Sequence, residues 1–384
     1  MADAKPYGGK VFTIPFIVGL VVVALMFFFL AQRFLYGLGP VTGMSDGYPW
    51  GIWIAYDVNV GTAFACGGYA MAILIYIFNR GEYSPLLKPA ILTSFMGYAL
   101  AGFSIFFDIG RYWNMYNIFL PWHFNWHSVM FEVAVCIAAY ILILLLETAP
   151  PFLKKFKLHN IEQKLNKVLF VVVALGLLLP TMHQASLGSL MVLAGNKMNP
   201  LYWSQALPLL FLLAAILLGY AFVIFEATLA GVSYKNPSEK HLLKKLSTLL
   251  PWLIGGFLVI RLQDINARGA LDAMFAGDLA GNFFLLETLL LLAAFFVLLP
   301  SRHRRSSIMV LWASFMVLLG AGLYRLDTYL IGFTPGDGWH YFPTTPEVII
   351  TFGIISIKIL VYVWATKRAP ILHFPPGKGQ PETG

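Results

Sequence analysis

The chain has 384 residues, of which 59% are hydrophobic and 11% are charged, and its mean hydropathy is +0.75. Soluble domains carry about a quarter charged residues, so this composition excludes an ordinary soluble protein. The formal net charge of +8 does not indicate nucleic-acid binding, because the basic residues lie in short loops between apolar stretches. The two cysteines, Cys66 and Cys136, form no CxxC motif, so the chain cannot by itself ligate an iron–sulfur cluster or a structural zinc.

Ten apolar stretches are long enough to cross a bilayer, which requires about 20 residues. They predict an all-α integral membrane protein with about ten transmembrane helices. The approximate limits are 14–35, 52–79, 88–110, 124–147, 167–184, 205–231, 247–264, 280–299, 306–328 and 346–366. No basic segment or small-residue cleavage site precedes the first stretch, so we expect a retained helix rather than a signal peptide.

The Lys and Arg residues of the loops predict the orientation of these helices. The segments on the side of the N-terminus hold 19 of them, whereas those on the other side hold 5. Because positive residues accumulate in cytoplasmic loops, both termini of this multi-pass chain are expected to be cytoplasmic. The outer loops are longer and are rich in Gly, Pro, Trp and Tyr. This composition predicts ordered loops that cap a cavity or dock a partner.

Ionisable residues recur at the outer ends of the predicted helices. An ionisable group inside a membrane span costs at least about 2.5 kcal/mol, so it usually faces the interior of a helix bundle and is a candidate functional residue. A polar chamber near the outer membrane surface is therefore expected. The nine residues are Asp57, Asp108, Arg111, Glu132, His183, Arg261, Asp264, Glu287 and Arg325.

The polar positions also indicate a duplication of the middle eight helices. Asp108–Arg111 and Arg261–Asp264 share a spacing of three residues, and each pair can meet on one helical face if the helix extends far enough. Helices four places apart have the same orientation, so we expect two four-helix bundles related as a parallel repeat, plus two peripheral helices. The expected units are an N-terminal helix and outer loop at 1–51, bundles at 52–204 and 205–330, and a last helix with a cytoplasmic tail at 331–384.

His183 is the strongest single candidate for chemistry. It follows Pro180, which frees backbone carbonyls that neighbours or a cavity must satisfy. An imidazole can donate to a quinone carbonyl and relay a proton near neutral pH, although a membrane histidine can equally be a hydrogen-bonded packing residue.

Further ionisable residues suit proton transfer. Glu132 and Glu287 lie eight or nine residues inside their predicted spans, too deep for easy contact with bulk water. Glu226 and Lys358 are the main ionisable groups of the inner half of the membrane. The candidate proton-transfer residues are therefore Glu132, Asp264, Glu287, Glu226 and Lys358.

The histidines bear on whether a b-type haem is bound, because such a haem requires one or two axial histidines. Only His127 and His183 lie within predicted spans, both near the outer surface. The stacked histidine pairs of a cytochrome b are missing from the pattern. No haem and no other metal site in this chain are expected.

Several short motifs together resemble one protein family. They lie at 49–57, 64–68, 108–114, 180–184, 276–278 and 324–326. The combination is similar to the NrfD/polysulfide-reductase membrane-subunit family, and within it to the HybB-type subunits of membrane-bound uptake [NiFe] hydrogenases. The similarity extends over nearly the whole chain.

The resemblance implies a haem-free, quinone-reactive subunit in the bacterial inner membrane that uses menaquinone or another quinone. It implies a ferredoxin-like iron–sulfur partner on the periplasmic face, linked to the small and large [NiFe] hydrogenase subunits, with iron–sulfur clusters only in those partners. Membrane lipid is the other expected partner, and no nucleic-acid partner is expected.

The resemblance also implies which residues form the quinone site. Asp57, Asp108, Arg111 and His183 are the expected catalytic residues, with Arg111 orienting the carboxylates. The expected pocket residues are Trp50, Tyr112, Trp113, Gln184 and Arg325. Lys358 stands where relatives are expected to have an acidic residue, which argues against a shared proton role there.

Two alternatives remain at the level of sequence. The same quinone module could serve another oxidoreductase, such as a polysulfide or nitrite reductase. The sequences of the loops that would bind the partner do not identify that partner. A transporter of parallel repeats would also bury charges, but it should carry polar groups through the whole membrane depth, and the inner half here is nearly bare. We expect the partner subunit to dock on the loops at 36–51 and 111–123.

Overall fold

The computed structural model describes residues 4–5, 7–233, 240–336, 338–369 and 371–373. These residues form helices and loops, apart from two strands of two residues each. Ten helical spans within them are long and apolar enough to cross a membrane. The prediction of an all-helical, multi-pass membrane protein with about ten spans is confirmed.

The first five spans come from the N-terminal half of the chain. In order, the helical elements are α1 (Ile14–Tyr36), η1 (Trp53–Val58), α2 (Asn59–Phe64), α3 (Gly67–Ala72), η2 (Ile73–Ile77), η3 (Gly81–Tyr83), α4 (Ser84–Asp108), η4 (Tyr112–Phe119), α5 (Val129–Lys155), α6 (His159–Ala194) and η5 (Gly195–Lys197). The segments η1, α2, α3 and η2 together make the second span.

The other five spans follow after the loop at 198–206. Their elements are α7 (Leu207–Ser233), α8 (Lys240–Leu246), α9 (Leu249–Ala267), η6 (Asp272–Phe275), α10 (Leu279–Leu298), η7 (His303–Arg305), α11 (Ser307–Tyr329) and α12 (Thr345–Arg368). The strands β1 (Ala4–Lys5) and β2 (Leu372–His373) pair antiparallel.

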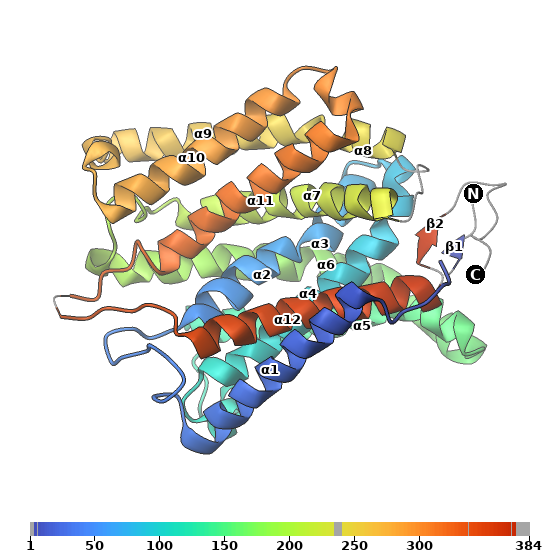
Figure 1. Cartoon of the computed structure of the whole chain (residues 1–384), viewed down its shortest axis with the longest axis horizontal. Coiled ribbons are helices and arrows are strands. Elements are labelled where there is room, and N and C mark those ends of the chain that lie inside the picture. The colour runs from blue at the N-terminus through green and yellow to red at the C-terminus, as the bar shows by residue number, and fades with distance from the viewer. Residues whose placement is uncertain (1–3, 6, 234–239, 337, 370, 374–384) are drawn as a thin grey trace.

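The helices form two groups of four. In the first group, the broken second span packs against α4, α4 against α5, and α5 against α6. In the second group, α7, α9, α10 and α11 each pack against the next, and α11 returns to α7. The groups meet where α7 packs against α3 and α6. Helices α1 and α12 lie side by side along one flank, so the predicted two bundles and two peripheral helices are present (Figure 1).

The break in the second span follows from its run of small residues. A Cβ atom on Gly68 would lie 2.9 Å from the Ser94 hydroxyl oxygen, and one on Gly219 would lie 2.6 Å from the Cys66 carbonyl oxygen. Glycines at these positions let the backbone of the second span approach both α4 and α7 closely. The helix is interrupted at Ala65 and Cys66, where this contact between the two groups is made.

Two of the predicted span limits that bear on the site were wrong. The fourth begins at Val129 rather than at 124, because the Ser128 side chain caps the helix by accepting from the Phe131 amide. The fifth does not end at 184: α6 continues to Ala194 with Pro180 inside it. Glu132 is therefore in the first turn of its helix, whereas His183 lies well inside α6.

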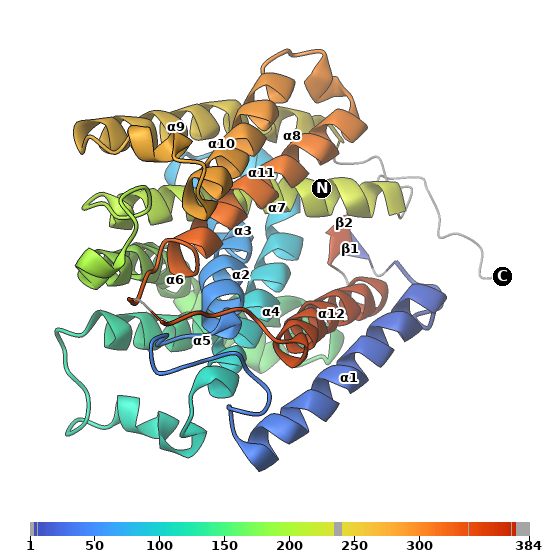
Figure 2. The same ribbon diagram turned by 60° about the vertical axis from the view of Figure 1, so that its left-hand side comes forward.

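The loops at the end of the bundle away from the two termini, which we call the outer loops, are joined to one another, as an ordered cap requires (Figure 1). The Thr344 hydroxyl donates to the Val41 carbonyl oxygen at 2.6 Å, and the Gly43 amide donates to Glu347 at 2.8 Å. In a second contact, Met198 and Phe333 form an isolated β-bridge. Figure 2 shows the loop between α4 and α5 at the periphery of the molecule, outside the helices.

Candidate functional site

The core of the first bundle contains a hydrogen-bonded group around His183. The imidazole and the Gln184 side chain are fully buried. The His183 Nε2 atom lies 3.1 Å from the Tyr98 hydroxyl oxygen and 2.9 Å from the Gln184 amide nitrogen. The same amide reaches the Thr62 hydroxyl oxygen at 3.1 Å, and the Cys66 sulfur lies 3.2 Å from the Tyr98 hydroxyl oxygen. We call these five residues the histidine network.

The position of His183 in α6 selects its tautomer. Its Nδ1 atom lies 3.1 Å from the Leu179 carbonyl oxygen, one turn earlier in the helix. A carbonyl oxygen can only accept, so Nδ1 carries the hydrogen and Nε2 of the neutral ring accepts from Tyr98 and Gln184. The ring can donate from Nε2 only after it has gained a second proton. In the neutral ring, Nε2 thus faces two donors, the Tyr98 hydroxyl and the Gln184 amide.

Arg325 of α11 lies beside this network at the contact between the bundles. Its guanidinium is fully buried and donates to the backbone and side-chain oxygens of Asn59 at 2.9 and 3.1 Å, and to the Phe211 carbonyl oxygen at 2.9 Å. Arg325 interacts electrostatically with Cys66 and His183. Its Nη2 atom has no hydrogen-bond partner among the described residues. A buried donor is therefore available next to the histidine network.

Three buried carboxylates gather beneath the outer loops. Asp108, at the end of α4, accepts from the Gly51 amide at 3.1 Å. A Cβ atom on Gly51 would lie 2.9 Å from Asp108 Oδ1 and 3.2 Å from Glu347 Oε1, so both carboxylates flank this glycine. Asp57, which accepts from Thr351 at 3.5 Å, interacts electrostatically with Asp108. Asp57, Asp108 and Glu347 form the outer acidic cluster.

Tyr341 joins this cluster to the cap. Its hydroxyl donates to Glu347 at 2.7 Å and accepts from the Ile52 amide at 2.7 Å. Burial, together with the neighbouring Glu347 carboxylate, raises the pKa of Tyr341 above its ordinary value. The hydroxyl therefore stays protonated and keeps its role as a donor to Glu347.

Arg111 does not pair with Asp108, contrary to the expectation from their spacing. Helix α4 ends at Asp108 and the next residue is extended, so the helical face does not continue. Arg111 is exposed. The arginine that lies near Asp108 is Arg33 of α1, which is 1% exposed, donates to the Phe107 carbonyl oxygen at 2.8 Å and interacts electrostatically with Asp108.

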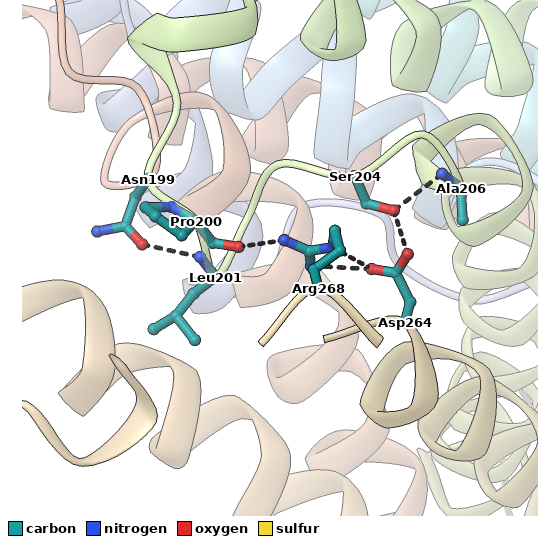
Figure 3. A network of polar contacts seen from close by, with 7 residues as sticks. All are labelled: Asn199, Pro200, Leu201, Ser204, Ala206, Asp264 and Arg268. Carbon is teal, nitrogen blue, oxygen red and sulfur yellow. Dashed lines mark hydrogen bonds and ion pairs between the residues drawn. The ribbon is translucent and has the colours of Figure 1, made fainter. Parts of the chain in front are cut away.

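The second predicted pair, Arg261–Asp264, is not formed either. Asp264 binds Arg268 one turn later, with 2.8 Å between Oδ2 and Nη2, and accepts from Ser204 at 2.7 Å. Arg268 in turn donates to the Pro200 carbonyl oxygen at 2.5 Å (Figure 3). Asp264 thus ties the end of α9 to the loop before α7. Arg261 instead donates to Glu287 in a buried ion pair.

The remaining proton-transfer candidates belong to two separate contacts. Glu132 accepts from the Ser186 hydroxyl at 2.8 Å on the α5–α6 contact. Glu226 accepts from the Thr93 hydroxyl at 2.9 Å, and it interacts electrostatically with Lys358. The nine residues expected in a single chamber therefore belong to several separate contact groups.

The aromatic residues predicted to line the pocket also lie in different parts of the structure. Trp50 is buried and donates from its indole nitrogen to the Tyr329 carbonyl oxygen at 3.0 Å. Tyr112 packs against Phe34 with ring centroids 4.8 Å apart, at the α1 side. Trp113 is 59% exposed. Among the predicted pocket residues, only Gln184 and Arg325 lie at the histidine network.

Comparison with known proteins places the chain in a family. The sequence model described as "Polysulphide reductase, NrfD" matches residues 40–331. The chain belongs to the NrfD family. The "Probable Ni/Fe-hydrogenase 2 b-type cytochrome subunit" of Escherichia coli strain K12 is 43% identical over 96% of this NrfD-family chain and 95% of its own length. This confirms the resemblance drawn from the motifs.

Two other relatives carry different names. The "Menaquinone reductase, integral membrane subunit" of Nitratidesulfovibrio vulgaris is 27% identical over 87% of the chain and 86% of its own length. A selenate reductase subunit of Mesobacillus selenatarsenatis is 23% identical over 87% of the chain and 90% of its own length. The NrfD scaffold therefore recurs in proteins named for different oxidoreductases.

The comparison corrects the expectation of no haem. The 43% identical relative is named a b-type cytochrome subunit, which implies haem, and the expectation from the histidine pattern is overturned. The described side chains do not form an axial ligand pair in this conformation. His183 has both ring nitrogens hydrogen-bonded, and His127 is exposed.

Sequence reasoning missed several buried polar residues of this NrfD-family chain. Arg33 lies in a strongly apolar stretch, and an arginine in such a stretch already indicates a candidate functional residue. Glu347 belongs to the Thr344–Glu347 capping box of α12, a pattern that is readable in the sequence. Asp327 directly follows the motif at 324–326, and an acidic residue in an apolar span was again a signal. Tyr98 carried no local signal, because tyrosines are common in membrane spans.

Proposed function

We propose that this chain is the quinone-reactive membrane subunit of a hydrogen:quinone oxidoreductase, and that the histidine network is its reaction centre. The supporting observation is the buried set of hydroxyl, imidazole and amide groups in the first bundle. The names of the two relatives, a hydrogenase subunit and a menaquinone reductase subunit, support the same assignment. Menaquinone or a related quinone is the proposed substrate.

The chemistry requires two electrons and two protons for each quinone reduced to quinol. In the proposal, the electrons come from iron–sulfur clusters of a ferredoxin-like partner, and this chain supplies the protons. His183 donates to a quinone carbonyl from Nε2 once that atom is protonated, and Tyr98 passes the proton to it. Arg325, whose buried Nη2 atom has no hydrogen-bond partner among the described residues, is the group proposed to stabilise negative charge that develops on the quinone oxygen.

We assign the outer acidic cluster a supporting role. Asp57 and Asp108 replace the protons used at the histidine network, and Arg33 takes the orienting role first expected of Arg111. Glu132, at the contact between α5 and α6, is a further candidate proton donor in the first bundle. Glu226 and Lys358 would extend the route to the inner side, where they interact with each other.

We place the partner on the outer face. The proposed complex contains a ferredoxin-like iron–sulfur subunit and the small and large [NiFe] hydrogenase subunits, at the periplasmic side of the bacterial inner membrane, with both termini of this chain cytoplasmic. The loop at 111–123 is the stronger docking candidate, because Trp113, Tyr116 and Trp122 are 59%, 61% and 74% exposed. In the loop at 36–51, Val41 and Trp50 are buried in the cap instead.

The proposal is tested by hydrogen-dependent reduction of a menaquinone analogue in membranes with and without this subunit. We expect reduction to be lost without the subunit, while hydrogen oxidation with a soluble dye is retained. Retention of both activities would overturn the proposed quinone role. If neither sample oxidises hydrogen, the hydrogenase partnership is wrong, and the same quinone module serves another oxidoreductase, as the selenate reductase relative illustrates.

A further inference from the structure

The second bundle contains buried polar side chains that the proposed quinone chemistry does not use. Arg261 of α9, Glu287 of α10, and Tyr324 and Asp327 of α11 are each at most 2% exposed. Arg261 donates to Glu287, and its guanidinium carbon lies 4.4 Å from the centroid of the Tyr324 ring. Asp327 interacts electrostatically with both Glu287 and Arg261. We call these four residues the second-bundle cluster.

Each member of this cluster has an atom without a hydrogen-bond partner among the described residues. These atoms are Arg261 Nη1, Glu287 Oε2, Asp327 Oδ2 and the Tyr324 hydroxyl oxygen. Buried polar groups in proteins are nearly always satisfied, so a concentration of unpartnered atoms requires an explanation such as a bound ion or water. Three of the four atoms are oxygens, which are the ligands that hard cations prefer.

The formal charges of the cluster do not balance. Arg261 is positive, whereas Glu287 and Asp327 are both carboxylates, so one negative charge is in excess. Among the described residues, Glu287 forms an ion pair with Arg261, but Asp327 forms none. An isolated carboxylate in an apolar bundle is too costly to remain charged without a counter-ion.

No other charged group that the structure describes on the neighbouring elements neutralises Asp327. Arg325 is two residues away on α11, and residues at that spacing do not face each other on a helix. Its donors instead reach Asn59 and Phe211 at the contact between the bundles. Several other charged groups on elements that pack against the cluster are bonded elsewhere: Asp57 to Thr351, Glu226 to Thr93, Asp264 to Arg268, and Arg304 to the Leu298 and Leu299 carbonyl oxygens. The rest are exposed, namely Asp272, Arg302, Arg305 and the lysines of α8.

We propose that Asp327 and Glu287 bind one monovalent cation, a proton or Na⁺, inside the second bundle. The cation balances the excess carboxylate, and the unpartnered oxygens of Glu287, Tyr324 and Asp327 are its acceptors. Arg261 holds Glu287 in position from the other side. Helix α11 also carries Arg325, but none of the four cluster residues has a role in the proposed quinone site, so this proposal does not rest on the quinone chemistry.

The test uses the purified full-length protein and two variants that balance the charge in different ways. Asp327→Asn leaves Arg261 with Glu287, and Glu287→Gln leaves Arg261 with Asp327, so neither variant needs a cation. Asp272→Asn is the matched control, because Asp272 is exposed in η6. Two measurements are made on each protein: infrared spectroscopy of the carboxylic-acid C=O band at neutral pH, and thermal unfolding in NaCl against choline chloride at equal ionic strength.

The two measurements distinguish the two cations. If a proton is bound, the wild type and the control show an acid C=O band component that both charge-balancing variants lose. If Na⁺ is bound, NaCl raises the melting temperature of the wild type and the control by several degrees over choline chloride, and the variants lose this shift. The proposal is overturned if no band component depends on either carboxyl group and the unmodified protein melts at the same temperature in both salts. That last comparison requires no variant to fold.

Discussion

The Nε2 atom of His183 lies 3.1 Å from the Tyr98 hydroxyl oxygen, while its Nδ1 atom faces the Leu179 carbonyl oxygen at the same distance. One edge of the imidazole is therefore bonded to its own helix, and the other edge is bonded to the Tyr98 and Gln184 side chains. The Tyr98 ring also packs edge-on against Tyr140, with centroids 4.6 Å apart. These contacts restrain the orientation of both groups before any substrate binds.

The first prediction concerns His183→Ala. Removal of a positioned proton donor lowers turnover by about 100-fold or more, so hydrogen-dependent quinone reduction should fall by at least that factor. Assembly with the partner subunits should be unchanged, as measured by co-purification. The matched control is His159→Ala, because His159 is exposed at the start of α6. Near-normal turnover in His183→Ala would remove His183 from the mechanism.

The second prediction separates the tyrosine hydroxyl from its ring. Tyr98→Phe keeps the edge-on contact with Tyr140 but leaves His183 Nε2 with only the Gln184 amide as a donor. We expect turnover to fall by about tenfold, less than in His183→Ala, because the imidazole remains. The melting temperature should change little compared with this loss of turnover. Equal losses in turnover and in folded protein would instead indicate a packing role for Tyr98.

The architecture was predictable from the sequence because membrane spans are defined by length and hydropathy, and both are local properties. The site was less predictable because helix limits decide which side chains meet. Asp108 and Arg111 share a face only in a continuous helix, and α4 ends at Asp108. Asp108 instead binds the Gly51 amide, 57 residues earlier in the chain. A hydrogen-bond partner 57 residues away in the chain produces no periodic pattern in the sequence, so it could not be predicted.

The buried charges follow the same logic. Their presence was readable, because an ionisable residue in an apolar stretch stands out. Their partners were not: Arg261 pairs with Glu287 from the next span rather than with Asp264 one turn away. Asp264 pairs with Arg268 because both lie at the end of α9, where they are partly exposed and next to a loop.

The third prediction concerns Gly51, which lies between two carboxylates. An alanine Cβ atom there would lie 2.9 Å from Asp108 Oδ1 and 3.2 Å from Glu347 Oε1, closer than ordinary contacts. Gly51→Ala should therefore displace Asp108 and destabilise the protein by about 1–3 kcal/mol, with a loss of quinone reductase activity. The control is Gly39→Ala, because a Cβ atom on Gly39 would meet no atom within 4 Å. Thermal unfolding and turnover measure the two effects. Equal stability and turnover of the two variants would contradict the crowding at Gly51.

The fourth prediction is an asymmetry between the two halves of the Arg261–Glu287 ion pair. Arg261→Met leaves two buried carboxylates, Glu287 and Asp327, without a cationic side chain. Glu287→Met leaves Arg261 beside Asp327, which interacts with it electrostatically and can replace the lost partner. Breaking a buried pair typically costs about 3–5 kcal/mol, and we expect that cost for Arg261→Met and a clearly smaller one for Glu287→Met.

Chemical or thermal unfolding of the purified variants measures this difference. The Arg261→Met, Glu287→Met double variant supplies the internal control, since it removes the pair but leaves Asp327 as a single unpaired carboxylate. Its stability should lie above that of Arg261→Met alone, because one of the two uncompensated carboxylates is gone. If the two single variants were equally destabilised, Asp327 would not be close enough to Arg261 to replace Glu287. Asp327 would then lie outside the charge balance of the Arg261–Glu287 ion pair.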